Sequence, residues 1–501
     1  MKLGIDLGTT RTIVALVDRG NYPVVSFSDP DGDTVDHFPS VVARRGDRLV
    51  FGFEAERAAA EGAVLVRSFK RELASGSIAG DATIDVEGMP VRLLDLVTGF
   101  LRALADALRT TSNVTSLLAD DEPLEAVVAV PAHAHSAQRF LTLAAFRAAG
   151  FEVLGLLNEP SAAGFEFTHR QPRSVNSRRT RVVVYDLGGG TFDASLVRVD
   201  DLTHEVVDSV GINRLGGDDF DEVLAACAQR EVGSRVDLRG RERAALLDEC
   251  RVAKENLSPQ SKRIALEVGH APVVVGVDAF YAAAGPLVEA TLTALEPLLG
   301  GLDGEQLEAA EVAGIYLVGG ASGLPLVARV LRERFGRRVH RSPHPAASTA
   351  IGLAIAADAT SGFHLTDRLS RGFGVFREWD AGARLAFDAL LDRDQRTSPD
   401  ADVVVTRRYR PVHNIGAFRF VEYGSLGASG QPSGDVVPCA ELLFPYDRAL
   451  RDGRDLRAEP VERVGEGPLV EETYTIDRHG IVTARITDVE DGFSLSSRLG
   501  D

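Results

Sequence analysis

Two glycine turns carry carboxylate, amide and hydroxyl groups at the spacing that phosphate and Mg²⁺ chemistry requires. They are DLGTT (6–10) and DLGGGT (186–191), and each one follows a β-branched run and leads into another. Glycine lets backbone amides approach a ligand closely, and these amides together with threonine hydroxyls can cradle phosphate oxygens. Asp6 and Asp186 stand at the strand ends and can hold hydrated Mg²⁺, which keeps several waters and uses few carboxylates. If the turns face each other, they predict a clamp on the β- and γ-phosphates of a nucleotide.

A third glycine turn, LVGGASG (317–323), follows a predicted strand and opens a predicted helix. This is a usual place for the adenosine or phosphate of a nucleotide. One such turn alone is more often an ordinary hairpin, but three turns together favour a nucleotide site. The patterns GxGxxG and GxxxxGK[ST] do not occur, which argues against a Rossmann dinucleotide site and a P-loop.

The elements that must position these turns alternate between short β-branched runs and longer amphipathic stretches, which is typical of α/β architecture. We expect strands over 2–6, 12–18 and 125–131, and strand–turn–strand over 181–200. We expect helices over 93–109, 136–150, 241–258 and 344–359, and a strand, glycine turn and helix over 314–336. Ser136 is the expected N-cap of its helix, and Gly150 and Gly336 are expected to end theirs. The repeated DLG turn predicts two related lobes.

After about residue 360, turn residues divide the chain into short alternating runs that predict antiparallel strands. The runs are VVVTRRYRPV, GAFRFVEYG, CAELLFPYD, EETYTIDRHG and IVTARITDVE. We therefore predict an α/β nucleotide-binding domain over 1–359, an interdomain linker over 360–368 and a small all-β domain over 369–501.

Composition argues against several functions. The 501 residues carry a formal charge of −18, which repels nucleic acid and anionic membranes, so we expect neither as a partner. The three cysteines, Cys227, Cys250 and Cys439, lack metal-ligand spacing. We see neither a signal peptide nor a membrane-spanning segment and expect a cytoplasmic protein. Only four of the 55 basic residues are lysine, so Lys70 and Lys254 invite a functional reason.

A set of longer motifs in a fixed order resembles the heat-shock protein 70 chaperones (DnaK-like). The motifs are GIDLGTTRTIVA, FPSVV, SFKREL, AVVAVPAHAHSAQR, NEPSAAGF, VVYDLGGGTFDASLV, LGGDDFD, AKENLS and YLVGGASGLPLV. The resemblance is stronger over 1–357 than over 369–501. It implies a two-lobed ATPase domain of the actin/hexokinase-like (ribonuclease H-like) class, followed by a β-sandwich. It also implies slow hydrolysis of ATP to ADP and phosphate, with Mg²⁺ and with K⁺ as a further cation.

The resemblance assigns roles at matching positions. Lys70 corresponds to the catalytic lysine that positions the γ-phosphate, and Glu159 and Asp193 correspond to the carboxylates near the attacking water. Thr191 completes the catalytic set, and Asp6 and Asp186 surround Mg²⁺ and its waters. The implied nucleotide-binding residues are Gly8, Thr9, Thr10, Arg11, Gly188, Gly189, Gly190, Thr191, Gly216, Gly217, Lys254, Ser258, Gly319, Gly320 and Ser322. Pro131 and Arg139 correspond to the relay between nucleotide state and linker.

Four residues depart from the family pattern around the nucleoside. Gly323 stands where the family has its adenine-stacking arginine, Arg251 stands at the usual acidic ribose contact, and residues 346–347 are alanines instead of an acidic pair. Because the phosphate-binding residues are intact, we still expect ATP as the ligand, with weaker affinity or less strict base discrimination.

The resemblance implies extended apolar peptides or unfolded proteins as ligands of the β-domain, held by backbone hydrogen bonds and apolar pockets. It also implies a J-domain co-chaperone and a nucleotide exchange factor as partners. Gly155 replaces a basic residue that helps to dock the J-domain, which predicts a weaker contact. In the linker, Phe363 and Leu365 are the only large apolar residues, which predicts weaker coupling. Since the sequence ends at Asp501, before the family's helical lid, we expect a lidless member with faster ligand exchange.

Three classes of function are therefore open. The first is a lidless ATP-dependent chaperone. The second is an ATP-driven scaffold or signalling switch for one dedicated partner, which the sparse linker and Gly155 favour. The third, a sugar or metabolite kinase or an actin-like filament protein, would share the phosphate turns but should lack LGGDDFD and the β-domain.

Overall fold

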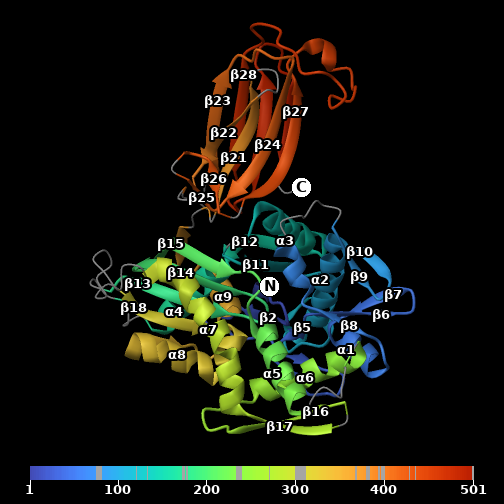
Figure 1. Cartoon of the computed structure of the whole chain (residues 1–501), viewed down its shortest axis with the longest axis vertical. Coiled ribbons are helices and arrows are strands. Elements are labelled where there is room, and N and C mark those ends of the chain that lie inside the picture. The colour runs from blue at the N-terminus through green and yellow to red at the C-terminus, as the bar shows by residue number, and fades with distance from the viewer. Residues whose placement is uncertain are drawn as a thin grey trace.

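The computed structural model describes a mixed α/β body with a β-domain standing on it (Figure 1). It describes residues 1–498, apart from 75–81, 120, 133, 172–174, 176–178, 233–237, 239, 270, 300–311, 367–368, 370, 380–383, 393–394, 396–400, 428 and 435. Within these residues, we find no helix with the length and apolar character needed to cross a membrane.

The first lobe is built on a five-stranded sheet in the order β12-β11-β1-β2-β5. The strands are β12 (Phe151–Asn158), β11 (Leu124–Val130), β1 (Lys2–Leu7), β2 (Arg11–Leu16) and β5 (Phe38–Pro39). β1 runs antiparallel to β2 and parallel to β11. One face packs against α2 (Leu93–Thr110) and α3 (Ser136–Ala148), and the other against α9 (Ser348–Ala357).

The second lobe repeats this arrangement in a six-stranded sheet, β19-β18-β13-β14-β15-β20. The strands are β19 (Val339–Arg341), β18 (Val312–Val318), β13 (Arg181–Leu187), β14 (Phe192–Asp200), β15 (Thr203–Ile212) and β20 (His364–Thr366). Its outer face packs against α5 (Gly217–Val232), α7 (Val277–Leu299) and α8 (Pro325–Phe335), and its inner face against α4 (Glu159–Arg170). In both lobes a DLG turn joins the antiparallel pair, β1–β2 or β13–β14, so the two predicted lobes are confirmed.

Smaller elements complete this body. They are β3 (Phe27–Ser28), β4 (Thr34–Val35), β6 (Val41–Arg45), β7 (Arg48–Phe51), α1 (Gly52–Ala60), β8 (Leu65–Arg67), the 3₁₀ helix η1 (Phe69–Ala74), β9 (Thr83–Val86), β10 (Met89–Arg92), η2 (Thr115–Leu117), α6 (Arg241–Glu255), β16 (Arg263–Val268), β17 (Ala271–Gly276), η3 (Gly320–Gly323) and η4 (Gly336–Arg338). Helix α9 begins four residues later than predicted, because Pro343 and Pro345 disfavour helical backbone in the residues before them.

The C-terminal part consists of antiparallel strands in two four-stranded sheets, as predicted. One sheet has the order β22-β21-β24-β27, from β22 (Arg384–Leu391), β21 (Gly372–Trp379), β24 (Ile415–Tyr423) and β27 (Val437–Pro445). The other contains β23 (Val403–Tyr409), β28 (Val470–Ile476), β29 (Val482–Asp488) and β30 (Ser494–Arg498). β25 (Ser425–Leu426), β26 (Pro432–Ser433) and the 3₁₀ helix η5 (Arg448–Leu450) complete it. Apolar side chains of both sheets form one shared core, typical of a β-sandwich. The domain boundaries at 359/360 and 368/369 stay predictions.

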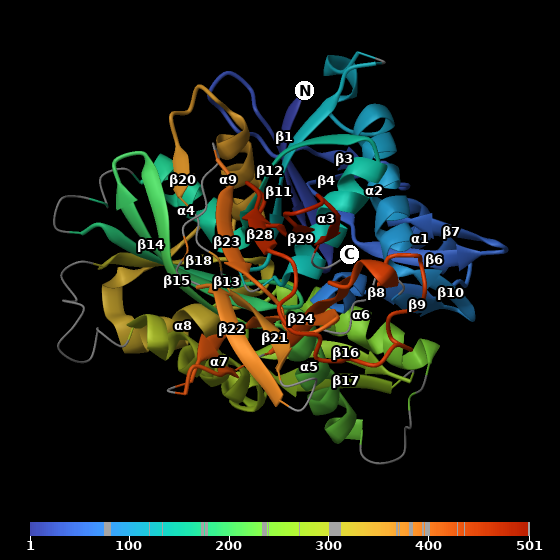
Figure 2. The same cartoon turned by 90° about the horizontal axis from the view of Figure 1, so that it is seen from above.

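The β-domain contacts the first lobe at helix α3 (Figures 1 and 2). The backbone amide of Ser136 donates to both carboxylate oxygens of Glu422 on β24, at 3.1 Å, and the Ser136 hydroxyl donates to the same carboxylate. Arg139 Nε donates to the carbonyl oxygen of His479, at 3.1 Å. The predicted N-cap Ser136 is therefore wrong. His135 caps α3 by accepting from the Gln138 amide, while Ser136 is the first helical residue and donates to the other domain.

Residues of the predicted linker form strand β20, which pairs in parallel with β15. The Phe363 ring packs against the rings of Phe165, His204 and His169, with centroid distances of 5.5, 5.6 and 6.3 Å. His204 is fully buried, and its Nε2 lies 3.0 Å from the Thr168 hydroxyl. The linker is thus held to the second lobe by one strand pairing and by the aromatic cluster around Phe363.

We expect acid to weaken this contact through His204. Burial lowers the pKa of His204 to about 4 from its ordinary value of 6.5. Between these values the unfolded chain binds a proton that the folded chain does not bind, so stability falls as the pH decreases through this window. From pH 7 to pH 5 the loss is about 2 kcal/mol. Calorimetric unfolding at both pH values should show a smaller decrease for His204→Phe; an equal decrease in both proteins would contradict the assignment.

Candidate functional site

The two DLG turns face each other across the interface between the lobes. A Cβ atom at Gly189 would lie 2.8 Å from Thr10 Oγ1, and one at Gly190 would lie 2.8 Å from Thr9 Oγ1. Any larger residue would therefore displace the opposite turn. Each turn is closed on itself, with Gly8 N donating to the Asp6 carbonyl and Gly188 N donating to the Thr191 carbonyl, both at 3.0 Å.

A cluster of charged side chains lies directly beneath the turns. Lys70 on η1 places its Nζ 2.5 Å from Oε1 of Glu159, the first residue of α4. Asp6 is the second-last residue of β1, while Asp186 on β13 and Asp193 on β14 are paired across their strands. Lys70, Glu159, Asp186 and Asp193 are each at most 8% exposed. The structure thus brings together residues that are as many as 187 positions apart in the sequence.

Burial and mutual repulsion change the acidity of these carboxyl groups. Burial, with the nearby Glu159 carboxylate as the second cause, raises the pKa of Asp6 and of Asp193 to about 7. Burial, together with the nearby Glu159, Asp6 and Asp193 carboxylates, raises the pKa of Asp186 well above its ordinary value. Burial alone would lower the pKa of Lys70, but Glu159 and Asp6 outweigh it and raise it. One lysine among four carboxyl groups leaves a site that favours additional cations.

This donor set fits a hydrated Mg²⁺. Within the described ranges, no group of three or more His, Cys, Asp or Glu side chains is arranged to hold a metal directly. Mg²⁺ does not require such a group, because it keeps several waters and binds through one or two carboxylates together with phosphate oxygens. Asp6 and Asp186, at the ends of the two facing strands, are suitably placed for this role.

Beside the two DLG turns, the second lobe contributes Gly217 and Lys254 to the lining of the cavity between the lobes. The Lys254 Nζ donates to the Gly217 carbonyl at 2.6 Å and lies 2.6 Å from Asp221 Oδ1. Burial raises the pKa of Asp221 to about 6, although Lys254 lowers it. A Cβ at Gly216 would lie 2.6 Å from Gly190 N, so this segment also requires glycine.

The third predicted turn, at 319–323, also lines this cavity. Gly319 has φ = +82° and donates its amide to the Pro345 carbonyl at 2.8 Å. Ser322 is fully buried and donates to the Gly319 carbonyl at 2.7 Å, so its hydroxyl supports the shape of the turn. The exposed Ser258 lies 3.2 Å from Ser261 Oγ, and its neighbours Leu257 and Pro259 line the cavity in its place.

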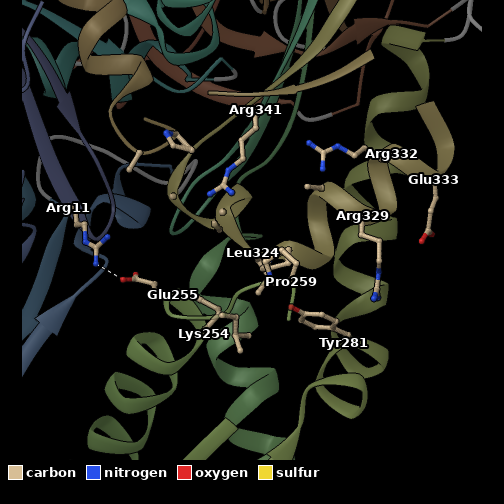
Figure 3. Close-up of a pocket in the computed structure, with 18 residues that line it drawn as sticks. Arg11, Lys254, Glu255, Pro259, Tyr281, Leu324, Arg329, Arg332, Glu333 and Arg341 are labelled. Atoms are coloured by element: carbon tan, nitrogen blue, oxygen red, sulfur yellow. Dashed lines mark hydrogen bonds and ion pairs between the residues drawn. The ribbon is translucent and has the colours of Figure 1, made fainter. Parts of the chain in front are cut away.

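The cavity between the lobes has a narrow and a wide part. The narrow part, about 100 Å³, is lined by the two DLG turns, Lys70 and Glu159. The wide part, about 870 Å³, is large enough for a nucleoside. Both parts share Arg11, Lys254, Glu255, Gly320, Ala321, Pro345 and Ala346, so they are continuous. Figure 3 shows Arg11 reaching Glu255 across the mouth, where their side chains pair at 2.6 Å.

Several contacts between the lobes were not predicted. Arg71 Nη2 donates to Asp219 Oδ2 at 2.9 Å, and the Ser68 hydroxyl donates to Asp218 Oδ2 at 2.6 Å. Within the second lobe, Arg251, where the family pattern places an acidic residue, lies 3.6 Å from Asp221 and lines the narrow part. The contacting residues lie in the motifs SFKREL and LGGDDFD, both of which the sequence analysis singled out. Neither motif indicates by itself that the two segments face each other in the fold.

The residues predicted as a relay connect the site with the β-domain. Pro131 follows the end of β11, and the amide of the next residue, Ala132, donates to Asp193 Oδ1 at 3.2 Å. Arg139 Nη1 donates to the side chain of Asn158 at 3.0 Å, and Asn158 directly precedes Glu159. Arg139 therefore contacts both the segment that carries Glu159 and the β-domain.

Two lobes of matching topology, a nucleotide-sized cavity between facing glycine turns and an appended β-sandwich define an actin/hexokinase-like ATPase fold with a β-domain. The family model described as Hsp70 protein matches residues 2–385. The chain therefore belongs to the Hsp70 family.

Curated relatives agree with this assignment. A "Chaperone protein HscA homolog" of Burkholderia orbicola (strain MC0-3) is 35% identical over 379 residues, which cover 72% of this chain and 59% of that protein. The homolog of Burkholderia multivorans (strain ATCC 17616 / 249) is 34% identical over 378 residues, with the same coverage. The chain matches 59% of the length of these relatives.

Proposed function

We propose that this protein is an ATP-dependent molecular chaperone. It binds and slowly hydrolyses ATP, and the nucleotide state controls the binding of extended peptides or unfolded proteins by the β-domain. The observation that carries the proposal is the meeting of the two DLG turns above Lys70, Glu159 and Asp193, with the β-domain docked on the neighbouring helix α3. We place this activity in the cytoplasm, where the thiols of the three cysteines stay reduced.

The residues at the centre of the cavity suit phosphoryl transfer to water. Lys70 directs its ammonium group toward the position of the γ-phosphate, where it stabilises the charge that develops during transfer. Glu159 and Asp193 orient the attacking water and accept its proton, and Thr191 with the turn amides holds the phosphate oxygens. Mg²⁺ held at Asp6 and Asp186 would neutralise phosphate charge.

The relay of Pro131 and Arg139 would carry the nucleotide state outward. A change at Asp193 or Glu159 moves the Ala132 amide or Asn158, and both lie on segments that contact the β-domain through Ser136 and Arg139. A J-domain co-chaperone and a nucleotide exchange factor are the partners we propose for this cycle.

One observation favours the second candidate, a switch for a single dedicated partner. The β-domain has a cavity of about 580 Å³ whose lining includes Arg377 and Tyr409. Both side chains bind Glu472, which is fully buried. A cavity whose lining carries five arginines suits one specific ligand better than a series of apolar peptides.

Peptide binding in ATP and in ADP tests the proposal, with the unsubstituted protein and Thr191→Ala compared by fluorescence anisotropy on unrelated apolar peptides. We expect several peptides to bind, about tenfold more weakly in ATP than in ADP, a difference of about 1.4 kcal/mol. Thr191→Ala should reduce this difference, because the hydroxyl that senses the phosphate is lost. If ATP binds but no peptide responds to it, the dedicated switch is the better assignment.

A further inference from the structure

The wide part of the cavity contains an arginine that is not engaged by the rest of the described chain. Arg341 is the last residue of β19, opposite Leu317 on β18. Its side chain is exposed and reaches back over the third glycine turn, so that a Cβ atom at Gly323 would lie 3.2 Å from Arg341 Nη2. In Figure 3 the guanidinium group points from β19 into the cavity above the turn.

Two other arginines of this cavity already have partners. Arg11 pairs with Glu255 at 2.6 Å, and the Arg329 guanidinium lies 5.2 Å from the ring centroid of Tyr281. No hydrogen bond or ion pair joins Arg341 to another residue in the described part of the chain. Its position over Gly323 is therefore not explained by a structural contact.

The ligand of this region follows from its continuity with the phosphate cradle. A nucleoside triphosphate that fills the narrow part must place its ribose and base in the wide part, since the two share Gly320, Ala321 and Pro345. A base is flat and aromatic and is best held by a planar group. Among the described residues that line the wide part, Tyr281 is the one aromatic side chain, and Arg329 already packs on its ring.

We propose that Arg341 stacks its guanidinium group on the base of the bound nucleotide, in the space that Gly323 leaves open. This rests on the proposed ATP binding, which it deepens by assigning the residue that holds the base. A guanidinium group is planar and delocalised and packs favourably on aromatic faces. Because every base has such a face, the contact sets affinity for nucleotides in general and discriminates little between adenine and guanine.

Titration calorimetry with Mg²⁺ and ATP, GTP or inorganic tripolyphosphate tests this role. We expect Arg341→Ala to bind ATP and GTP about tenfold more weakly and tripolyphosphate as tightly as the unsubstituted chain. Arg341→Lys, which keeps the charge but not the plane, should resemble Arg341→Ala. The matched control is Arg337→Ala, because Arg337 is an exposed arginine of the same lobe outside the cavity lining and should leave all three affinities unchanged.

A second variant tests the position of the stack. Since a Cβ at 323 would contact only the tip of Arg341, an arginine introduced there fits once Arg341 is shortened. Gly323→Arg combined with Arg341→Ala should therefore restore most of the lost ATP affinity. Unchanged ATP affinity in Arg341→Ala, or an equal loss for tripolyphosphate, would overturn the stacking role. Failure of the unsubstituted chain to bind ATP would instead remove the proposed function on which the role depends.

Discussion

Lys70→Ala is expected to reduce the rate of ATP hydrolysis about a thousandfold while leaving nucleotide binding within a fewfold of the unsubstituted protein. The Lys70 ammonium is buried and paired with Glu159 at 2.5 Å, at the floor of the narrow cavity. Removing one such donor to developing charge costs on the order of 3–4 kcal/mol in a dry site. In the proposed site, we expect binding to depend mainly on the turn amides and on Lys254, which the substitution does not touch. Single-turnover hydrolysis and equilibrium titration measure the two quantities separately.

The matched control for this experiment is Lys262→Ala. Lys262 is an exposed lysine outside the cavity lining, so its removal changes the net charge equally without touching the site. Loss of Lys70 also leaves Glu159 buried without its cation, so folding should be checked by circular dichroism. A folded Lys70→Ala protein that hydrolyses ATP at more than a tenth of the original rate would remove Lys70 from the catalytic role.

Gly352→Ala should destabilise the nucleotide-binding part by about 3 kcal/mol or more. Gly352 lies within α9, and a Cβ atom there would be 1.7 Å from the carbonyl oxygen of Ala162 on α4. The two helices cannot separate easily, because α9 is also pressed against β1, where a Cβ at Gly4 would be 2.3 Å from the Ala350 carbonyl oxygen. Overpacking against backbone is among the more costly kinds of core substitution. Since β1 carries Asp6 and α4 begins at Glu159, ATP binding should weaken as well.

Gly285→Ala is the control for this prediction. Gly285 lies in α7, and a Cβ atom there would have no neighbour within 4 Å. Alanine is favoured over glycine in a helix by about 1 kcal/mol, so this variant should be unchanged or slightly more stable. Calorimetric unfolding of both variants would decide. If Gly352→Ala and Gly285→Ala shift the midpoint of thermal unfolding equally, the close approach of α4 and α9 is not the cause of the destabilisation.

Local motifs predicted most of the candidate site. Strand ends and glycine turns are set by neighbouring residues, so the positions of Asp6, Asp186 and the DLG turns could be read from the sequence, and the antiparallel β-domain likewise. The features that the sequence did not predict depend on contacts between residues that are far apart in the chain. The cap of α3 was misassigned because the partner of Ser136 is Glu422, 286 positions later. The position of Arg341 over Gly323 depends equally on packing, since the parallel pairing of β18 and β19 places Arg341 beside the strand that leads into the turn.

Because the Ser136 amide donates a hydrogen bond to Glu422, the first turn of α3 reports whether the two domains are docked or separated. The free amides at the start of a helix need acceptors, and here one acceptor is supplied by the other domain. If the β-domain undocks, as the proposed cycle requires, this amide would be hydrogen-bonded by water instead, while the rest of α3 would keep its internal bonds. Deuterium uptake at that one turn would thus follow the fraction of undocked molecules in each nucleotide state, without any attached label.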